Sequence, residues 1–136
     1  MISANLWKAR FDMRGRVLVI AGSDSGGGAG IQADIKTITM LGGYAATAIT
    51  AITVQNTLGV SAIHPVPQAV ITEQICAVLD DIGADCIKIG MLGDEQTIHA
   101  VAACLKRHAP GIPLVLDPVM MAKGGAALLP PAVVHA

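Results

Sequence analysis

A short apolar run, residues 17–20, leads into a glycine- and serine-rich segment, residues 23–30, and then into isoleucines at helical spacing. This order is typical of a strand, a tight turn and a helix. The glycines can adopt positive φ and bring the backbone close to a ligand, because they have no Cβ. The turn also precedes a helix N-terminus with free N–H groups. The segment therefore predicts a site for a polar small molecule at the carboxyl end of the first strand.

Apolar segments alternate with amphipathic segments along the rest of the chain. The predicted helices span residues 31–41, 69–82 and 95–107. The predicted strands span residues 17–21, 45–54, 61–64, 86–89 and 113–116. Asp94 is expected to cap the last helix. This alternation favours an α/β fold with a mostly parallel sheet flanked by helices. Residues 130–136 resemble the start of a further helix, and we expect the chain to be one part of a larger fold.

The composition excludes several classes of protein. The 136 residues fit one domain, and 53% hydrophobic content with only 2% aromatic residues predicts an aliphatic core. A net charge of −1 without clustered basic residues argues against nucleic-acid binding. No apolar run reaches the roughly 18 residues that a transmembrane helix needs, and the first residues contain no apolar signal segment. The three cysteines have no CxxC spacing, which favours reduced thiols and a cytoplasmic location.

Four motifs follow one another in the order found in one enzyme family. Residues 23–34 read Ser-Asp-Ser-Gly-Gly-Gly-Ala-Gly-Ile-Gln-Ala-Asp, and residues 55–57 read Gln-Asn-Thr. Residues 88–92 read Lys-Ile-Gly-Met-Leu, and residues 116–120 read Leu-Asp-Pro-Val-Met, shortly before an Ala-Lys-Gly-Gly segment. From residue 16 to residue 130, the chain resembles the bacterial hydroxymethylpyrimidine/phosphomethylpyrimidine kinases of thiamine biosynthesis, which belong to the ribokinase-like superfamily.

The resemblance implies a ribokinase-like kinase and its reaction. Members of this family use ATP and Mg²⁺ to phosphorylate 4-amino-5-hydroxymethyl-2-methylpyrimidine and then its monophosphate, and they usually form homodimers. Family members are much longer than this chain, and their proton acceptor, anion-hole turn and magnesium motif have no counterpart here. We therefore expect residues 16–136 to be the N-terminal part of one kinase domain, after an N-terminal extension over residues 1–15. We expect no catalytic residue in this chain and no kinase activity from the chain alone.

The glycine-rich segment does not match the two common nucleotide-binding patterns. No Lys-Ser or Lys-Thr follows its last glycine, and its glycine spacing differs from the dinucleotide-binding motif. From the residues alone, a tight turn without a ligand is an alternative. The resemblance assigns the segment, with Gly22 before it, to the substrate pocket, and it places Asp34 beside the substrate. We expect Asp34 in the first turn of the helix, where an acid can instead complement the helix dipole.

Gln55 is the residue that we expect to contact the pyrimidine. Its carboxamide offers one acceptor and two donors, which match a ring nitrogen and the adjacent exocyclic amine. The resemblance assigns it the same role, whereas a turn amide bonded to local backbone is the alternative. Met91 and Val119 follow two further strands. Met91 could lie against a flat ring or be part of the core, and the resemblance suggests that Val119 presents its backbone to the ring.

Two charged residues are candidates for the phosphate side of the site. Asp117 ends the last predicted strand, where it could lie near the phosphates or cap a loop, and Lys123 follows soon after. A solvated surface position is an equal alternative for Lys123, and Lys36 is also expected to be solvated. The four histidines share no metal-ligand spacing, so the sequence predicts no metal site in this chain.

Two other functions stay open at this point. A pyridoxal kinase could use the same scaffold, because pyridoxal also carries a hydroxymethyl group on a flat nitrogen-containing ring. A fragment that binds a metabolite without catalysis is the second alternative. The partner is a small molecule in all three cases, and the sequence favours the aminopyrimidine.

Overall fold

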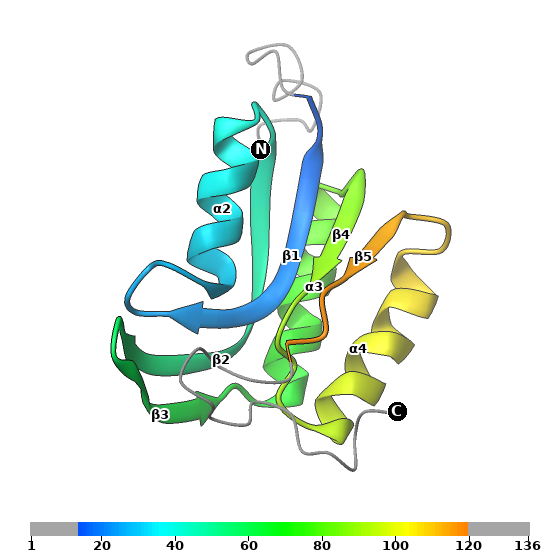
Figure 1. Cartoon of the computed structure of the whole chain (residues 1–136). Coiled ribbons are helices and arrows are strands. Elements are labelled where there is room, and N and C mark those ends of the chain that lie inside the picture. Colours follow the sequence, from blue (N-terminus) through cyan, green and yellow to red (C-terminus); the bar gives the residue numbers. More distant parts are fainter. Residues whose placement is uncertain (1–13, 120–136) are drawn as a thin grey trace.

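The computed structural model describes residues 14–119, which form a five-stranded sheet flanked by helices (Figure 1). The elements are, in chain order, β1 (Arg16–Asp24), α2 (Gly30–Met40), β2 (Tyr44–Asn56), β3 (Gly59–Pro65), α3 (Gln68–Asp81), β4 (Cys86–Ile89), α4 (Glu95–His108) and β5 (Leu114–Leu116). The strand order in the sheet is β3-β2-β1-β4-β5. β1 is parallel to β2 and to β4, and β4 is parallel to β5. The predicted α/β fold with a mostly parallel sheet is confirmed.

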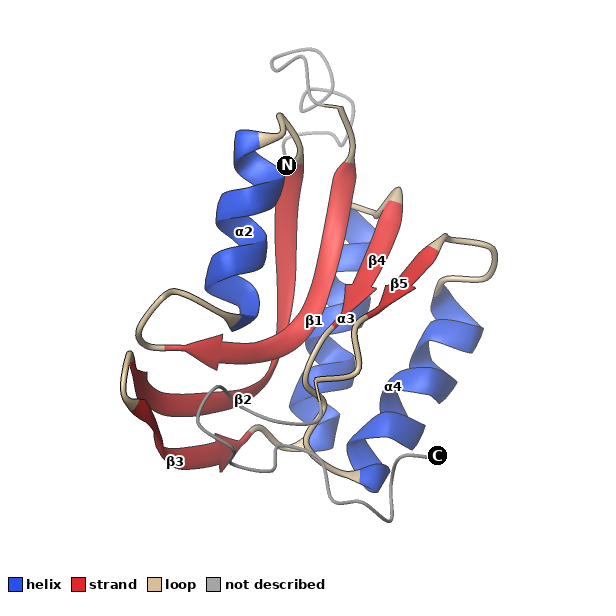
Figure 2. Cartoon of the chain, in the orientation of Figure 1, coloured by secondary structure: helices blue, strands red, loops and turns tan. Residues whose placement is uncertain are grey.

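The helices cover both faces of the sheet, with α2 on one face and α3 and α4 on the other (Figure 2). Side chains of β1 alternate between these two layers. Leu18 and Ile20 pack toward α3 and α4, whereas Val19 and Ala21 pack toward Ile31 of α2. All five are buried, and both core clusters consist mainly of aliphatic side chains, as the composition predicted.

The predicted ends of the helices are confirmed. Gly42 follows α2 with a φ of +81°, and the N–H of Gly43 donates to the carbonyl oxygen of Ile38 at 2.9 Å. This is the left-handed arrangement in which glycine commonly ends a helix. Gly83 has the same role after α3, with a φ of +73°. At the start of α4, Asp94 Oδ1 accepts a hydrogen bond of 2.7 Å from the N–H of Thr97.

The sheet differs from the prediction at two places. β3 is longer than expected and runs antiparallel to β2, so these two strands form a hairpin. The hairpin turn is held by Asn56, whose Oδ1 accepts hydrogen bonds from the N–H groups of Leu58 and Gly59. β1 also continues to Asp24, beyond its predicted end, because Asp24 still pairs with Thr53 of β2. The loop between β1 and α2 is therefore shorter than predicted.

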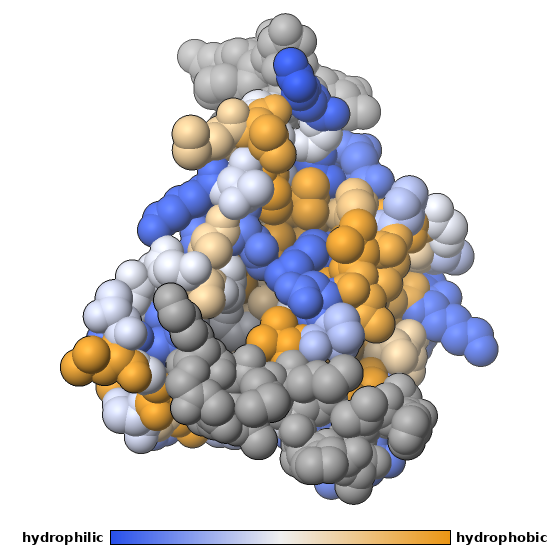
Figure 3. Space-filling model, in the orientation of Figure 1, coloured by the Kyte–Doolittle hydropathy of each residue, from blue (hydrophilic) through white to orange (hydrophobic). Residues whose placement is uncertain are grey.

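The β5 edge of the sheet exposes apolar side chains. Leu114, Val115 and Leu116 are between 48% and 59% exposed. Figure 3 shows the hydrophobic surface that they form. Among residues 14–119, β5 pairs with β4 alone, so its outer backbone groups face no described strand. Such an edge favours pairing with a further strand.

Candidate functional site

The candidate site lies along the edge of the sheet that is formed by the carboxyl ends of the four parallel strands, β1, β2, β4 and β5. This edge carries Gly22 and Asp24 from β1, Gln55 from β2, Met91 just after β4, and Asp117 directly after β5. In Figure 1 it includes the loop between β1 and α2. Doubly wound sheets commonly bind ligands outside the carboxyl ends of their strands. The predicted residues of these strands therefore come to the expected side of the sheet.

The carboxylate of Asp24 holds the glycine-rich loop in place. Its Oδ1 accepts a hydrogen bond from the N–H of Gly26 at 2.7 Å. Its Oδ2 accepts from the N–H groups of Gly28 and Ala29, at 3.0 and 2.8 Å. Asp24 is only 5% exposed, so water competes little for these bonds. Asp24 is not among the predicted site residues, although an aspartate two residues before a glycine is a signal for a side-chain-bonded turn.

Replacement of Asp24 by Ala is expected to lower the free energy of unfolding by about 2–4 kcal/mol, because three backbone N–H groups lose a charged acceptor. Asp24→Asn should lose less, since its amide oxygen keeps part of this bonding. The measurement is chemical denaturation followed by circular dichroism. Asp80→Ala, at an exposed position of α3, is the control and should change stability by less than about 0.5 kcal/mol. Equal losses in Asp24→Ala and the control would contradict the assigned role.

A polar network joins the start of the loop to its neighbours. Gln32 of α2 accepts from the N–H of Asp24 at 2.8 Å and donates to Ser23 Oγ at 2.7 Å. Thr53 of β2 donates to the carbonyl oxygen of Ser23 at 2.8 Å. No pattern in the sequence indicates Gln32 and Thr53, because their contacts depend on how α2 and β2 lie against β1. This network fixes the end of β1 beside the end of β2.

The backbone of Gln55 is held by hydrogen bonds, whereas the N–H donors of its side chain have no described partner. Its N–H donates to Ser25 Oγ at 2.8 Å, and this hydroxyl donates to the carbonyl oxygen of Gln55 at 2.6 Å. The side-chain Oε1 lies 3.2 Å from Thr53 Oγ1. Within residues 14–119, no hydrogen bond uses the Nε2 donors of this half-buried side chain. The glycine-rich loop therefore positions Gln55, and the carboxamide keeps the donors that a ring nitrogen would accept from.

Gly22 and Met91 are in contact at the same edge. In the parallel pairing of β1 with β4, Ile20 lies opposite Ile89. Gly22 and Met91, each two positions further along, therefore also lie next to each other. A Cβ at Gly22 would lie 2.7 Å from the Cε atom of Met91, so a larger residue there would require this flexible side chain to shift. Met91 is buried, and its carbonyl oxygen accepts a hydrogen bond of 2.7 Å from Thr50. A largely buried Met91 fits the core alternative, while its methyl group lies beside the expected pocket residue Gly22.

The predicted position of Asp34 in the first helical turn is wrong. α2 begins at Gly30, and its first turn contains no acidic residue. The carboxylate of Asp34 instead forms an ion pair with Lys88 of β4, with 2.8 Å between Nζ and Oδ2. Both side chains are about one-quarter exposed or less, and the pair ties α2 to the sheet. A role of Asp34 in substrate binding stays a prediction.

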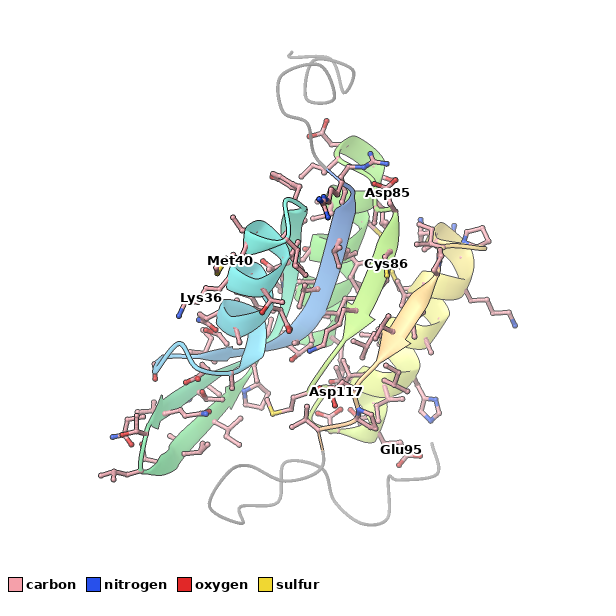
Figure 4. The ribbon with its side chains drawn as sticks, turned by 45° about the horizontal axis from the view of Figure 1, so that its top comes forward. Lys36, Met40, Asp85, Cys86, Glu95 and Asp117 are labelled. Carbon is pink, nitrogen blue, oxygen red and sulfur yellow. The ribbon has the colours of Figure 1, made fainter. Side chains whose placement is uncertain are left out.

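Of the remaining residues, Lys36 lies on α2, and Asp117, Val119 and Lys123 follow β5 in the chain. Lys36 is exposed on α2, as expected, but its ammonium group also donates to the carbonyl oxygen of Gly27 at 2.7 Å and so contacts the loop (Figure 4). Asp117 is exposed after β5, where its N–H donates to the carbonyl oxygen of Ile89 at 2.9 Å. Val119 is half-buried at the end of the described residues, and Lys123 lies outside them.

The described part of the chain contains neither a membrane-spanning helix nor a metal cluster. None of its helices is long and apolar enough to cross a bilayer. Between residues 14 and 119, no three His, Cys, Asp or Glu side chains are grouped so that they could hold a metal ion. The described residues alone do not supply a set of ligands for the Mg²⁺ that the resemblance implies. Asp117 is the one acid among them at the end of β5.

Comparisons with known proteins agree on one family. The family described as phosphomethylpyrimidine kinase matches residues 24–136. The hydroxymethylpyrimidine/phosphomethylpyrimidine kinase of Haemophilus influenzae is 58% identical over 114 residues, which are 84% of this chain and 42% of that protein. The crystal structure of phosphomethylpyrimidine kinase from Clostridium difficile has a TM-score of 0.80 and 47% identity, over 88% of this chain and 52% of that one. The pyridoxal kinase of Staphylococcus aureus in complex with pyridoxal has a TM-score of 0.73 and 38% identity, over 86% and 42%.

The two solved structures confirm the predicted ribokinase-like fold for this chain. The chain spans about half the length, or less, of these matched proteins. The matched residues include Gln55, Met91 and Asp117 and nearly all of the glycine-rich loop. The match to residues 24–136 and the 58% identity to a curated relative show that the chain belongs to the phosphomethylpyrimidine kinase family.

Proposed function

We propose that this chain forms the pyrimidine-binding part of an enzyme that phosphorylates 4-amino-5-hydroxymethyl-2-methylpyrimidine and its monophosphate with ATP, in thiamine biosynthesis. Family membership supports the kinase chemistry. The observation that carries the substrate assignment is Gln55, whose backbone is held by Ser25 while its Nε2 donors have no partner among residues 14–119. In this proposal Nε2 donates to a ring nitrogen and Oε1 accepts from the exocyclic amine.

The other residues at the edge support this assignment by their positions. Gly22 and Met91 would border the flat ring where β1 and β4 end, and Val119, which follows β5, would present its backbone groups to the ring. The loop that Asp24 holds would lie near the hydroxymethyl group, with Asp34 behind it on α2. Phosphoryl transfer depends mainly on the positioning of the two reactants and on charge stabilisation. The proposed task of these residues is to hold the alcohol in one orientation.

We further propose that residues 16–136 are the N-terminal part of the kinase domain and that residues 1–15 are an extension. The greater length of the matched proteins and the exposed apolar edge of β5 support further strands in the intact enzyme. These further elements would hold ATP and supply the catalytic base, with Asp117 and Lys123 on the phosphate side. Mg²⁺ would neutralise phosphate charge there. We also propose a cytoplasmic homodimer for the intact enzyme.

The test is an ATP-dependent phosphorylation assay on the full-length protein that contains this sequence. The expected result is rapid phosphorylation of hydroxymethylpyrimidine and of its monophosphate, and none by the 136-residue chain alone. Phosphorylation by the chain alone would contradict the proposed division between substrate-binding and catalytic parts. Failure of the full-length protein to act on either pyrimidine would contradict the proposed function.

Pyridoxal phosphorylation is the second candidate, because a pyridoxal kinase in complex with pyridoxal has the same fold. Its identity to this chain, 38%, is lower than the 47% of the phosphomethylpyrimidine kinase. Pyridoxal lacks an exocyclic amine beside its ring nitrogen, so it would use only part of the Gln55 carboxamide. A higher kcat/KM for pyridoxal than for hydroxymethylpyrimidine would favour this candidate.

A further inference from the structure

Two cysteine side chains face each other between α3 and α4. The Sγ atoms of Cys76 and Cys104 are 3.9 Å apart, although the residues are separated by 28 positions in the chain. Cys104 belongs to the core on the face of the sheet that α2 does not cover, and Cys76 packs against this core. The third cysteine, Cys86, lies on β4, and its Sγ lies 3.7 Å from the carbonyl oxygen of Ile87 (Figure 4).

The two sulfur atoms are close together but not at bonding distance. The sulfur atoms of a disulfide lie about 2 Å apart, so this pair must approach by roughly a further 2 Å. The approach requires rotation of the two side chains and small shifts of the helices. α3 and α4 pack against the same core, in which Cys104 is buried and Cys76 is half-buried. The fold therefore holds the two thiols near each other, and Cys76 is the one that a reagent reaches first.

We propose that Cys76 and Cys104 form an intramolecular disulfide that links α3 to α4 when a disulfide oxidant is present. With oxidised glutathione, the Cys76 thiolate attacks one sulfur of the oxidant and releases one glutathione thiolate. The Cys104 thiolate then attacks the Cys76 sulfur of the mixed disulfide and releases the second glutathione. The two cysteine thiols lose two electrons and two protons in total, and the oxidant is reduced to two glutathione molecules.

The chemistry of Cys104 makes the second step the slow one. Burial, with the neighbouring Cys76 thiol as a smaller cause, raises the pKa of Cys104 to about 11. Only a small fraction of this cysteine is therefore thiolate at neutral pH, and the thiolate is the form that attacks. A mixed disulfide at Cys76 should precede ring closure in time. Once closed, the disulfide restricts the unfolded chain over the segment between the helices.

The experiment treats the full 136-residue chain with oxidised glutathione, alkylates the remaining thiols and measures the mass. We expect one alkylated cysteine, Cys86, and a cross-link between Cys76 and Cys104. A protease that cleaves before aspartate separates the three cysteines, because Asp80 and Asp85 lie between Cys76 and Cys86 and Asp94 lies between Cys86 and Cys104. The Cys76–Cys104 product should exceed either product with Cys86 by on the order of tenfold in the native chain, and this preference should disappear in guanidinium chloride.

Single substitutions test the pairing. Cys86→Ser is the matched control and should form the cross-link like the unchanged chain. Cys76→Ser and Cys104→Ser should form none, and the half-buried position of Cys76 makes the first of these the milder change for folding. The closed disulfide should raise Tm by roughly 10 °C. Cross-links with Cys86 in equal yield, or a mixed disulfide at Cys76 that never closes, would overturn the proposal.

Discussion

In the full-length enzyme, Gln55→Ala should raise KM for hydroxymethylpyrimidine by about one order of magnitude or more, while kcat stays nearly unchanged. The groups that the carboxamide pairs with do not change during phosphoryl transfer, so the lost binding is equal in the ground state and the transition state. Each lost hydrogen bond contributes about 0.5–1.5 kcal/mol, and an unpaired buried group costs about 1–3 kcal/mol. Ser25 bonds to the backbone of Gln55 and not to its side chain, so Ala should leave the strand end in place.

Steady-state kinetics with each substrate varied in turn measures this effect. KM for ATP should stay nearly constant in Gln55→Ala. Gln96→Ala removes a glutamine from an exposed position on α4, and it should change neither KM by more than about twofold. A lower kcat with an unchanged pyrimidine KM would show that Gln55 acts in the chemical step, and its proposed place against the ring would then be wrong.

Gly30→Ala should lower the free energy of unfolding by about 3 kcal/mol or more. Gly30 has a φ of +54°, where an L residue with a Cβ costs roughly 1–2 kcal/mol. A Cβ at this position would also overlap the carbonyl oxygen of Gly22 and lie 3.3 Å from the backbone nitrogen of Asp24. Backbone atoms cannot rotate away as a side chain can, and the forced shift costs about 1–3 kcal/mol more. The shift would move the end of β1, so the pyrimidine KM should also rise.

Gly28→Ala is the matched control for this substitution. Gly28 lies in the same loop without a positive φ, and a Cβ there would meet only Asp24 Oδ2, at 4.0 Å. Chemical denaturation should find its free energy of unfolding within about 0.5 kcal/mol of the unchanged protein. If the two alanine variants lost equal stability, the close approach of Gly30 to β1 would not be what constrains the loop.

Most of the fold could be predicted from the sequence, because periodicity and stop residues record local structure. α4 begins directly after its predicted cap, Asp94. α2 and α3 end shortly before Gly42 and Gly83, within a residue or two of their predicted limits. The hairpin of β2 and β3 could not be predicted, because the antiparallel direction of their pairing depends on a turn at Asn56, and a turn leaves no periodic pattern in the sequence. The position of Asp34 was missed because the predicted helix start was late by one residue, which is a common error at helix ends.

The position of a single residue at a strand end was predictable, as for Gln55 near the end of β2, while its role in binding stays a prediction. The site was not predictable where it depends on contacts between strands. The contact of Gly22 with Met91 requires the register of β1 against β4, and the three hydrogen bonds to Asp24 require the folded path of the loop. The ion pair of Asp34 with Lys88 joins residues 54 positions apart, which no local pattern in one sequence indicates.

NMR of the ¹⁵N-labelled full-length protein can show whether the Gln55 carboxamide contacts the pyrimidine ring. The side-chain NH₂ signals of Gln55 can be assigned by their loss in Gln55→Ala. We expect hydroxymethylpyrimidine to shift these signals at saturation, while the NH₂ signals of Gln96 on α4 stay in place. If hydroxymethylpyrimidine bound and left the Gln55 signals unmoved, the carboxamide would not be in contact with the ring.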